Sequence, residues 1–436
     1  MSGEKVAFVC VLAAASLSAQ PQTAPADELL PRFQTAVNQM LRRLPDYTCA
    51  ETIARSVRVD PNAPYRKLDT IRLQVGWIGG QERYGRADAA SFDDREVRDL
   101  VGRGLTSSGN FAGHVQHVFL SAGTRFTPRG AASLRDRPAT RYDYEVPVEY
   151  SRYKIRGRPE EAEVGVHGSF WLDSQTLDLL RMEVHADEIP PELGMSRFGE
   201  IVDYARQSIG DGEVLLPASS ELTVLTLAGD EFRNQTTFND CRRFQADSKV
   251  RFDLDNEVVS TNTQPPAAPP ANNEVQPLPP SLLVDLVLDS DIDPEKAAVG
   301  DAVRALVTRS IQGATGLLIP EGSVVQGHLT RLDRAGQPFD HFIVGLEFRT
   351  LQAGNQRFAF FATMQNAGPA RGLLPEARRL DPVFTRRRTA RMDILVREKP
   401  HGEGILHIEA KHPQVRRGLK MRWRTLDPDK VPSNAP

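Results

Sequence analysis

The sequence lacks both a strong net charge and a long hydrophobic run. Its 57 Asp and Glu residues outnumber its 54 Lys and Arg residues by three, which gives a formal net charge of −3. A charge this small creates no global field that would attract nucleic acid or an anionic membrane. No apolar run approaches the roughly 18–20 residues that a helix needs to cross a bilayer. We therefore expect a protein that binds no nucleic acid and does not span a membrane.

The sequence signatures of common enzymes are also missing. There is no phosphate-binding glycine loop, no Gly-x-Ser-x-Gly turn and no His-Glu-x-x-His pair. Ser151 and Lys154 have the spacing of a serine–lysine nucleophile, but the alternating residues around them predict a strand, which would point them to opposite faces. We expect no enzyme and no cofactor, with an uncharacterised hydrolase as the alternative.

Metal-binding patterns are incomplete. His114 and His117 are three residues apart on a predicted helix, which would put two imidazoles on one side, but no third ligand lies nearby. Carboxylates recur at every second residue over residues 289–295, yet Pro294 stands where an EF-hand loop needs its glycine. We interpret the histidine-bearing helix as a packing element and the acidic stretch as an exposed turn, and expect no metal.

Cysteine is scarce, and the amino terminus explains one of the three. Lys5 precedes an apolar stretch over residues 6–15, and small residues follow it up to Ala19. This order is typical of a secretory signal peptide over residues 1–19, although a buried strand or helix start is the alternative. Cleavage would remove Cys10 and export the chain to the periplasm or the extracellular space. Cys49 and Cys241 would remain, and either a disulfide or two free thiols is compatible with the sequence.

Proline gathers in one stretch that divides the chain. Seven of the prolines lie between Gln264 and Pro280, among Ala, Asn and Gln. Proline locks φ and cannot donate to a strand ladder, so the run favours an extended spacer. We predict a linker over residues 256–280 between a domain at 27–255 and a second domain at 281–430.

Both predicted domains are rich in strands. In the first, Asp27 can cap one amphipathic helix that Pro45 ends, and alternating stretches at 71–77 and 142–150 then predict strands. In the second, at least six short alternating stretches separated by Gly-containing turns predict a sandwich or barrel. The fold class is therefore mainly β.

The order of these elements resembles two envelope protein families. One helix, a long meander with helical pieces at 92–119, and the strand Gly-Ser-Phe-Trp-Leu-Asp at 168–173 resemble the periplasmic half-barrels of the LolA, LolB and RseB type. That resemblance implies an α+β antiparallel half-barrel around an apolar cavity. The stretch from Val299 to Leu329 resembles the β-barrel domain of TrbI-type conjugal-transfer proteins of type IV secretion, which implies a small barrel and an envelope location.

The functional expectation follows from these parts. We predict a non-catalytic envelope protein that binds an apolar or lipidated ligand, such as a lipid or lipoprotein, in the half-barrel. A structural scaffold without a cavity is the alternative. The predicted cavity residues lie on the apolar phases of two strands: Ile71, Leu73, Val75, Trp77, Tyr142, Tyr144, Val146 and Val148. An excess of Lys and Arg over residues 371–425, including Arg386–Arg388, favours an anionic envelope polymer or a protein partner.

Overall fold

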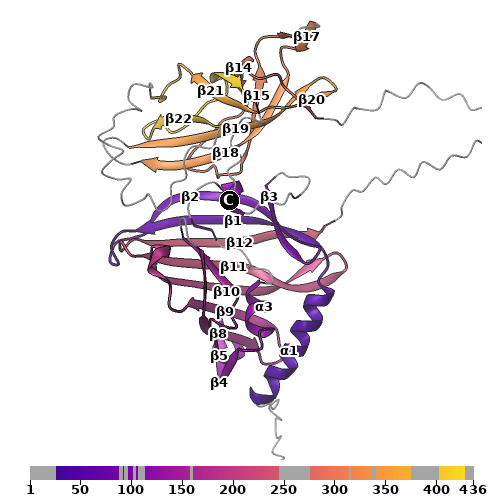
Figure 1. Ribbon diagram of the computed structural model, residues 1–436, viewed down its shortest axis with the longest axis vertical. Coiled ribbons are helices and arrows are strands. Elements are labelled where there is room, and N and C mark those ends of the chain that lie inside the picture. Colours follow the sequence, from indigo (N-terminus) through magenta and orange to yellow (C-terminus); the bar gives the residue numbers. More distant parts are fainter. Residues whose placement is uncertain are drawn as a thin grey trace, which may run out of the picture.

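The fold is described from a computed structural model (Figure 1). The described residues are 26–87, 92, 97–101, 105–106, 113–157, 161–244, 275–313, 316–335, 340–374 and 402–427. The predicted signal peptide, the linker up to residue 274 and Arg386–Arg388 lie outside these ranges. The protein is mainly β, with two large sheets, as the sequence predicts.

The first domain contains a ten-stranded antiparallel sheet. Its order is β3-β2-β1-β12-β11-β10-β9-β8-β5-β4. The strands are β1 (Tyr47–Arg58), β2 (Arg66–Ile78), β3 (Gln81–Arg86), β4 (Arg125–Leu134), β5 (Arg137–Val146), β8 (Val166–Asp173), β9 (Leu179–Ala186), β10 (Met195–Ile209), β11 (Gly212–Thr226) and β12 (Glu231–Arg243). β6 (Tyr153–Arg156) and β7 (Glu161–Val164) form a separate hairpin. The sheet is a half-barrel that helices line on one side (Figure 1).

Within the described ranges, three α-helices accompany this sheet: α1 (Ala26–Arg43), α2 (Val97–Val101) and α3 (Gly113–Phe119). A 3₁₀ turn, η1, covers Pro191–Leu193. The predicted amino-terminal helix is thus confirmed, although it begins at Ala26, so that Asp27 lies within it and does not cap it. Its buried side is formed by Leu29, Phe33 and Val37, each 3% exposed or less. Phe33 contacts Phe119 of α3 edge to face, with ring centroids 4.9 Å apart.

One row of paired residues crosses eight strands and defines the inner face of the sheet. Each residue in the row pairs with the next on the neighbouring strand: Ile71, Ile53, Thr236, Ser220, Val202, Met182, Phe170 and Tyr142. All eight are buried. Because side chains alternate between faces along a strand, the residues two positions away on each strand share this inner face.

Strand β5 ends four residues earlier than predicted. Pro147 follows its last residue, and the N–H groups of Tyr150 and Ser151 both donate to the Pro147 carbonyl, which forms a turn. Proline has no N–H for the ladder, so the strand ends there. Val148 is consequently 47% exposed, and its predicted place on the inner face is wrong.

The second domain contains a nine-stranded sheet. The order is β13-β20-β19-β18-β15-β14-β23-β21, and β22 also pairs with β19. The strands are β13 (Gln276–Pro277), β14 (Leu283–Leu288), β15 (Ala302–Val307), β18 (Val324–Ala335), β19 (His341–Ala353), β20 (Gln356–Ala359), β21 (Ala362–Ala367), β22 (Gly404–Glu409) and β23 (Lys420–Thr425), with β16 (Ile311–Gly313) and β17 (Gly316–Ile319) as a separate hairpin. Its core includes Trp423, which is fully buried against Phe348.

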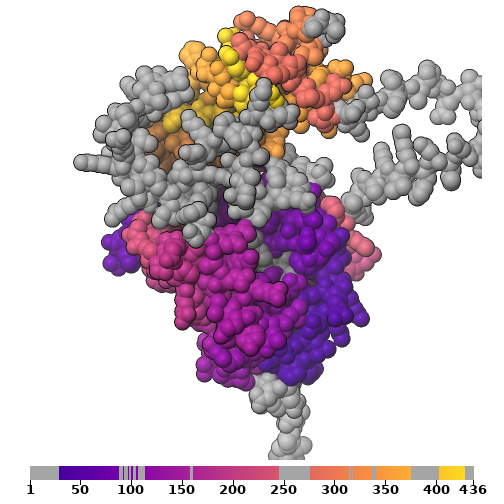
Figure 2. Space-filling view, in the orientation of Figure 1, coloured from indigo at the N-terminus to yellow at the C-terminus, as the bar shows by residue number. Residues whose placement is uncertain are grey.

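The two domains share one apolar core. Residues of β1, β2, β3 and α2 join residues of β14, β15, β18 and β19 in a continuous cluster, which we call the bridging core. The last part of the predicted linker also packs, because β13 pairs with β20 and Leu278 is 5% exposed. The orange and yellow second domain lies next to β2 and β1 in Figure 1, and Figure 2 shows it at the same end of the molecule.

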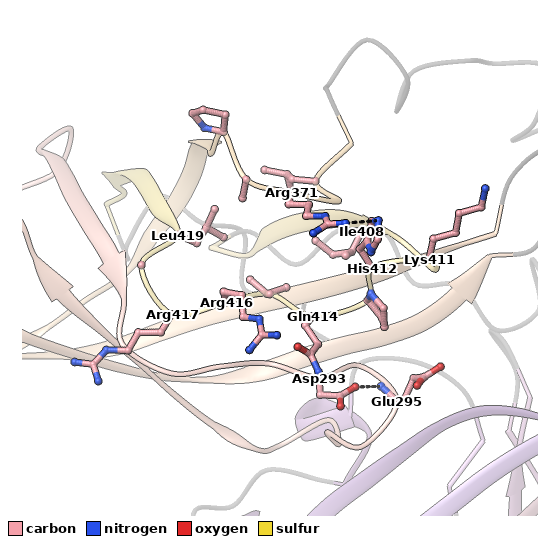
Figure 3. Close-up of a pocket in the computed structure, with 16 residues that line it drawn as sticks. Asp293, Glu295, Arg371, Ile408, Lys411, His412, Gln414, Arg416, Arg417 and Leu419 are labelled. Atoms are coloured by element: carbon pink, nitrogen blue, oxygen red, sulfur yellow. Dashed lines mark hydrogen bonds between the residues drawn. The ribbon is translucent and has the colours of Figure 1, made fainter.

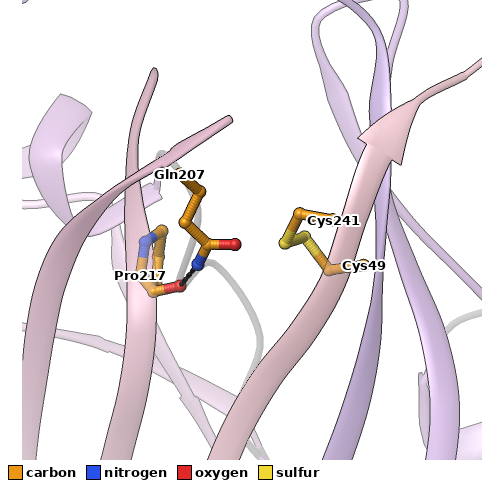
Figure 4. The surroundings of a disulfide bond; sticks show 4 residues. All are labelled: Cys49, Gln207, Pro217 and Cys241. Atoms are coloured by element: carbon orange, nitrogen blue, oxygen red, sulfur yellow. Dashed lines mark hydrogen bonds between the residues drawn. A yellow bond between two sulfur atoms is a disulfide. The ribbon is translucent and has the colours of Figure 1, made fainter. Parts of the chain in front are cut away.

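Cys49 and Cys241 form a disulfide between β1 and β12 (Figure 4). The pairing of these strands shifts register between Thr48 and Ala50, which leaves Cys49 opposite the extra residues of β12. Their Cα atoms are 4.1 Å apart, although 192 positions separate them in the sequence. The bond therefore joins the first strand of the meander to its last.

We expect both cysteines to be protected from alkylation in unreduced, denatured protein. Because the bond closes so long a loop, replacing both by serine should lower the free energy of unfolding by up to about 5 kcal/mol in the chain-entropy account. Mass spectrometry after alkylation and urea denaturation measure the two effects. Cys10→Ser serves as the control and should leave stability unchanged. Alkylation at both Cys49 and Cys241 without reductant would contradict the expectation.

Candidate functional site

The inner face of the half-barrel holds most of the predicted cavity residues, in two separate cores. Ile71, Leu73, Val75 and Trp77 are 7% exposed or less and belong to the bridging core. Tyr142, Tyr144 and Val146 belong to a second cluster, which we call the helix-covered core because α1 and α3 pack on it. The two sets thus share a face of one sheet without meeting.

Aromatic rings fill the helix-covered core. Phe170 lies at its centre and stacks on Tyr142, with ring centroids 5.0 Å apart. Phe119 meets the same ring edge to face at 4.9 Å, and Phe126 does so at 5.9 Å. Rings at these distances are in contact. Tyr142, Tyr144 and Val146, which were expected to line a hollow, therefore lie in a packed core together with Phe33 of α1 and Phe119 of α3.

A polar band lies on the inner face between the two cores. Glu51 of β1 and Glu200 of β10 are 2% and 1% exposed. Nε2 of His114, on α3, lies 3.1 Å from Oε2 of Glu200. The hydroxyls of Thr236 and Ser220 occupy the middle of the row described above. Buried polar groups in this position break the continuity of the apolar surface.

Burial raises the pKa of acidic groups in and beside this band. Burial, and then the nearby carboxyls of Glu82 and Glu200, raise the pKa of Glu51 well above its ordinary value. Burial and the carboxyl of Glu82 likewise raise the pKa of Tyr84, whose hydroxyl hydrogen-bonds to Glu82. Among the described residues, no donor reaches Oε2 of Glu51. The band therefore favours the protonated form of Glu51.

The weaker sequence candidates have structural roles. His114 is buried against Glu200 and stacks on Tyr153, in keeping with its interpretation as a packing residue. Ser151 Oγ accepts the N–H of Tyr153, and Lys154 pairs with Glu161 on the neighbouring strand. In the described ranges, no three His, Cys, Asp or Glu side chains are arranged to hold a metal ion.

The acidic residues of the 289–295 stretch contact protein groups. Asp289 pairs with the guanidinium of Arg417 at 2.8 Å, and Asp291 accepts the N–H of the same residue at 2.7 Å. Asp293 accepts the N–H of Glu295 at 3.1 Å. These contacts hold the stretch as a structured turn beside the loop at 410–419.

That turn forms one wall of a pocket in the second domain (Figure 3). The pocket has a volume of about 480 Å³. Its other walls come from residues 369–373 and from the loop at 411–419, while Leu373, Ile408 and Leu419 supply apolar surface. Two backbone hydrogen bonds between Ile292 and Val415, of 2.9 and 2.8 Å, join the walls at one side.

Positive charge predominates in this basic pocket. Its basic residues are Arg371, Lys411, Arg416 and Arg417, and its acidic residues are Asp293 and Glu295. Arg417 is engaged by Asp289, and Arg371 donates to Nε2 of His412 at 3.4 Å. In the part of the chain that the structure describes, Lys411 and Arg416 form no ion pair. Their charges therefore stay available to an anion.

A second hollow, of about 1020 Å³, lies on the outer face of β4, β5, β8 and β9. Its arginines are each paired with a carboxylate: Arg125 with Glu145 at 2.6 Å, Arg129 with Asp143 at 2.6 Å, and Arg141 with Asp143 at 3.1 Å. Because these guanidinium groups are engaged, the outer hollow offers fewer available cations than the basic pocket.

Sequence reasoning missed two features of these sites. Glu51 stands on the inward phase of β1, between Cys49 and Ile53, so an inward charge could have been noticed in the alternation. The basic pocket had only the general excess of Lys and Arg as a signal, since its walls come from three separate stretches of the sequence, at 293–295, 369–373 and 411–419.

The solved structures that are similar to about half of this chain include two bacterial proteins. A LolA superfamily protein from Nitrosomonas europaea is 10% identical, with a TM-score of 0.28, and the match covers 51% of this chain and 96% of that protein. A DUF1329 family protein from Desulfovibrio piger is 11% identical, with a TM-score of 0.27 and coverage of 52% and 95%. No protein-family profile and no curated protein matches the sequence. The half-barrel is identified from the strand order of the ten-stranded sheet.

No helix among the described residues is both long enough and apolar enough to cross a membrane.

We expect Glu51→Gln to stabilise the protein increasingly as the pH rises. Because folding raises the pKa of Glu51, its contribution is fully present below the ordinary value of 4.5 and is lost as the pH rises through the folded pKa. The uncharged amide avoids that loss. Thermal unfolding should therefore show equal Tm values for variant and wild type near pH 4, and a higher Tm for the variant near pH 8. Glu213→Gln, at an exposed position, is the control. A difference in Tm that does not change with pH would contradict the assignment.

Proposed function

We propose that this chain is a non-catalytic protein of the cell envelope that binds an anionic partner through the basic pocket. The observation that carries the proposal is the pair of unengaged cations, Lys411 and Arg416, beside Arg371 in a hollow of about 480 Å³. The signal peptide predicted at residues 1–19 and the resemblance of the stretch at 299–329 to an envelope barrel support an envelope location. The half-barrel then acts mainly as a scaffold.

The chemistry of the pocket favours phosphate or carboxylate groups on a larger molecule. Arginine offers a planar fork of donors that matches such groups, whereas lysine supplies a compact charge. The apolar side chains of Leu373 and Ile408 lie beside the cations, so an anion attached to an apolar or polymeric body fits better than a free ion. Asp293 on the opposite wall disfavours very dense negative charge.

We expect the protein to bind poly-L-glutamate, a carboxylate polymer used as a probe for an anionic polymer of moderate charge density, with an affinity that falls as salt is raised. Replacing Lys411 and Arg416 together by alanine should weaken binding about tenfold or more, which corresponds to about 1.4 kcal/mol. Isothermal titration at two salt concentrations measures this. Arg197→Ala, at an exposed position on β10 in the other domain, is the matched control. Equal affinities for all three proteins would contradict the proposal.

A second candidate is an apolar ligand held beneath α1, and one observation favours it. The helix lies at one side of the half-barrel (Figure 1) and packs against its inner face through the narrow stripe of Leu29, Phe33 and Val37. A small outward shift of such a helix would uncover the aromatic face around Phe170. An acyl chain from a lipid or lipoprotein would suit that face.

We expect Phe33→Ala to bind a fluorescent fatty-acid analogue more tightly than wild type, because removing the ring leaves apolar space that an apolar guest can fill. The same change should lower the free energy of unfolding by about 3–5 kcal/mol. Val59→Ala, at a residue 69% exposed, is the control and should change neither quantity. Absence of saturable binding by both wild type and a folded Phe33→Ala protein would remove this candidate.

A further inference from the structure

One edge of β2 is only partly covered by its own domain. β3 pairs with β2 over Leu73–Ile78, while β2 itself begins at Arg66. The part of β2 before Leu73 therefore does not pair with β3 on this edge. A strand edge without a neighbour presents N–H and C=O groups that accept pairing from another segment.

A turn of the second domain occupies this edge. The N–H of Arg72 donates to the Val299 carbonyl at 2.8 Å, and the N–H of Val299 donates to the Thr70 carbonyl at 2.7 Å. Ile71 and Val299 are thus paired in a short parallel bridge, and both side chains are buried in the bridging core. The second domain extends the first sheet by one residue at the place where β3 stops.

Charged side chains match on both sides of this contact. Both carboxylate oxygens of Asp301 accept from Nη1 of Arg72 at 2.8 Å. Asp301 also accepts the N–H of Ala298, which fixes its carboxylate within the turn. Farther along, the guanidinium of Arg86, 7% exposed, pairs with Glu347 of β19 at 2.9 Å. Ion pairs of this kind set orientation as well as adding attraction.

Gly300 allows the turn to come this close. Its φ of +98° lies in the region that favours glycine, and a Cβ at this position would overlap the carbonyl oxygen of Arg72. The turn is also fixed to its own domain, because Gly300 donates to Leu329 and Leu329 donates to Asp301. The docking turn therefore moves with β18.

We propose that the edge of β2 and the turn at residues 298–301 are an interdomain docking surface that holds the two domains together without the linker. The partner of the β2 edge is this turn of the same chain. The match rests on backbone pairing, on two ion pairs and on one glycine that no other residue can replace without displacing the contact. Cutting the linker then converts the chain into a noncovalent complex of two fragments.

The test uses the full chain with a site-specific protease sequence in place of residues 262–268. After cleavage, the two fragments should co-elute in size-exclusion chromatography at micromolar concentration and sediment as one species. Elution of two separate, folded fragments from the otherwise unmodified sequence would overturn the proposal.

Gly300→Ala in the cleavable chain should weaken association of the fragments about tenfold or more. Gly322→Ala is the matched control, since Gly322 also has a positive φ, of +80°, but nothing lies within 4 Å of an added Cβ. If Gly300→Ala fails to fold, two charge substitutions, Arg72→Asp and Asp301→Arg, replace it as the test. Each substitution alone should weaken the association of the fragments. The double variant should recover part of the lost affinity, because it restores an ion pair with the charges exchanged. Unchanged association in Gly300→Ala, or in both single charge variants, would also overturn the proposal.

Discussion

A ten-stranded sheet has to bury its apolar face along its whole width, and no single element of this chain is large enough to cover it. At one end α1 and α3 cover the sheet through Phe33 and Phe119. At the other end, α2 and the second domain complete the core, with Val299 beside Ile71. The second domain thus covers the part of the first sheet that the helices do not cover. The two domains share one core because the apolar face of that sheet has to be buried.

The polar band between the cores determines what the inner face can accommodate. A continuous apolar guest would have to cross Glu51 and Glu200, which are buried and lie between the two apolar ends. Each core by itself is packed with side chains. An apolar ligand would therefore need α1 to shift and would occupy only that end of the half-barrel, whereas the cations of the second domain suit a partner recognised by charge.

The loop at residues 289–301 connects the two surfaces to which we assign roles. Its first half, with Asp293 and Glu295, forms a wall of the basic pocket, and its last residues pair with the edge of β2. Hydrogen bonds anchor the loop at both ends, to Val415 on one side and to Leu329 on the other. The pocket and the domain contact thus depend on the conformation of the same segment.

Local pattern in the sequence was sufficient for the mainly β class, the amino-terminal helix and the inward phase of the strand at 71–77, because alternation and helical spacing depend on near neighbours. It misplaced Val148, since one proline outweighed an alternating run. The presence of two strand-rich domains could also be predicted, but not their contact. Three features join positions that are far apart in the chain: Val299 pairs with β2, Glu51 lies near Glu200, and Arg371 and Lys411 line the same pocket. Such contacts depend on strand order and curvature, which tertiary packing decides and local pattern does not encode.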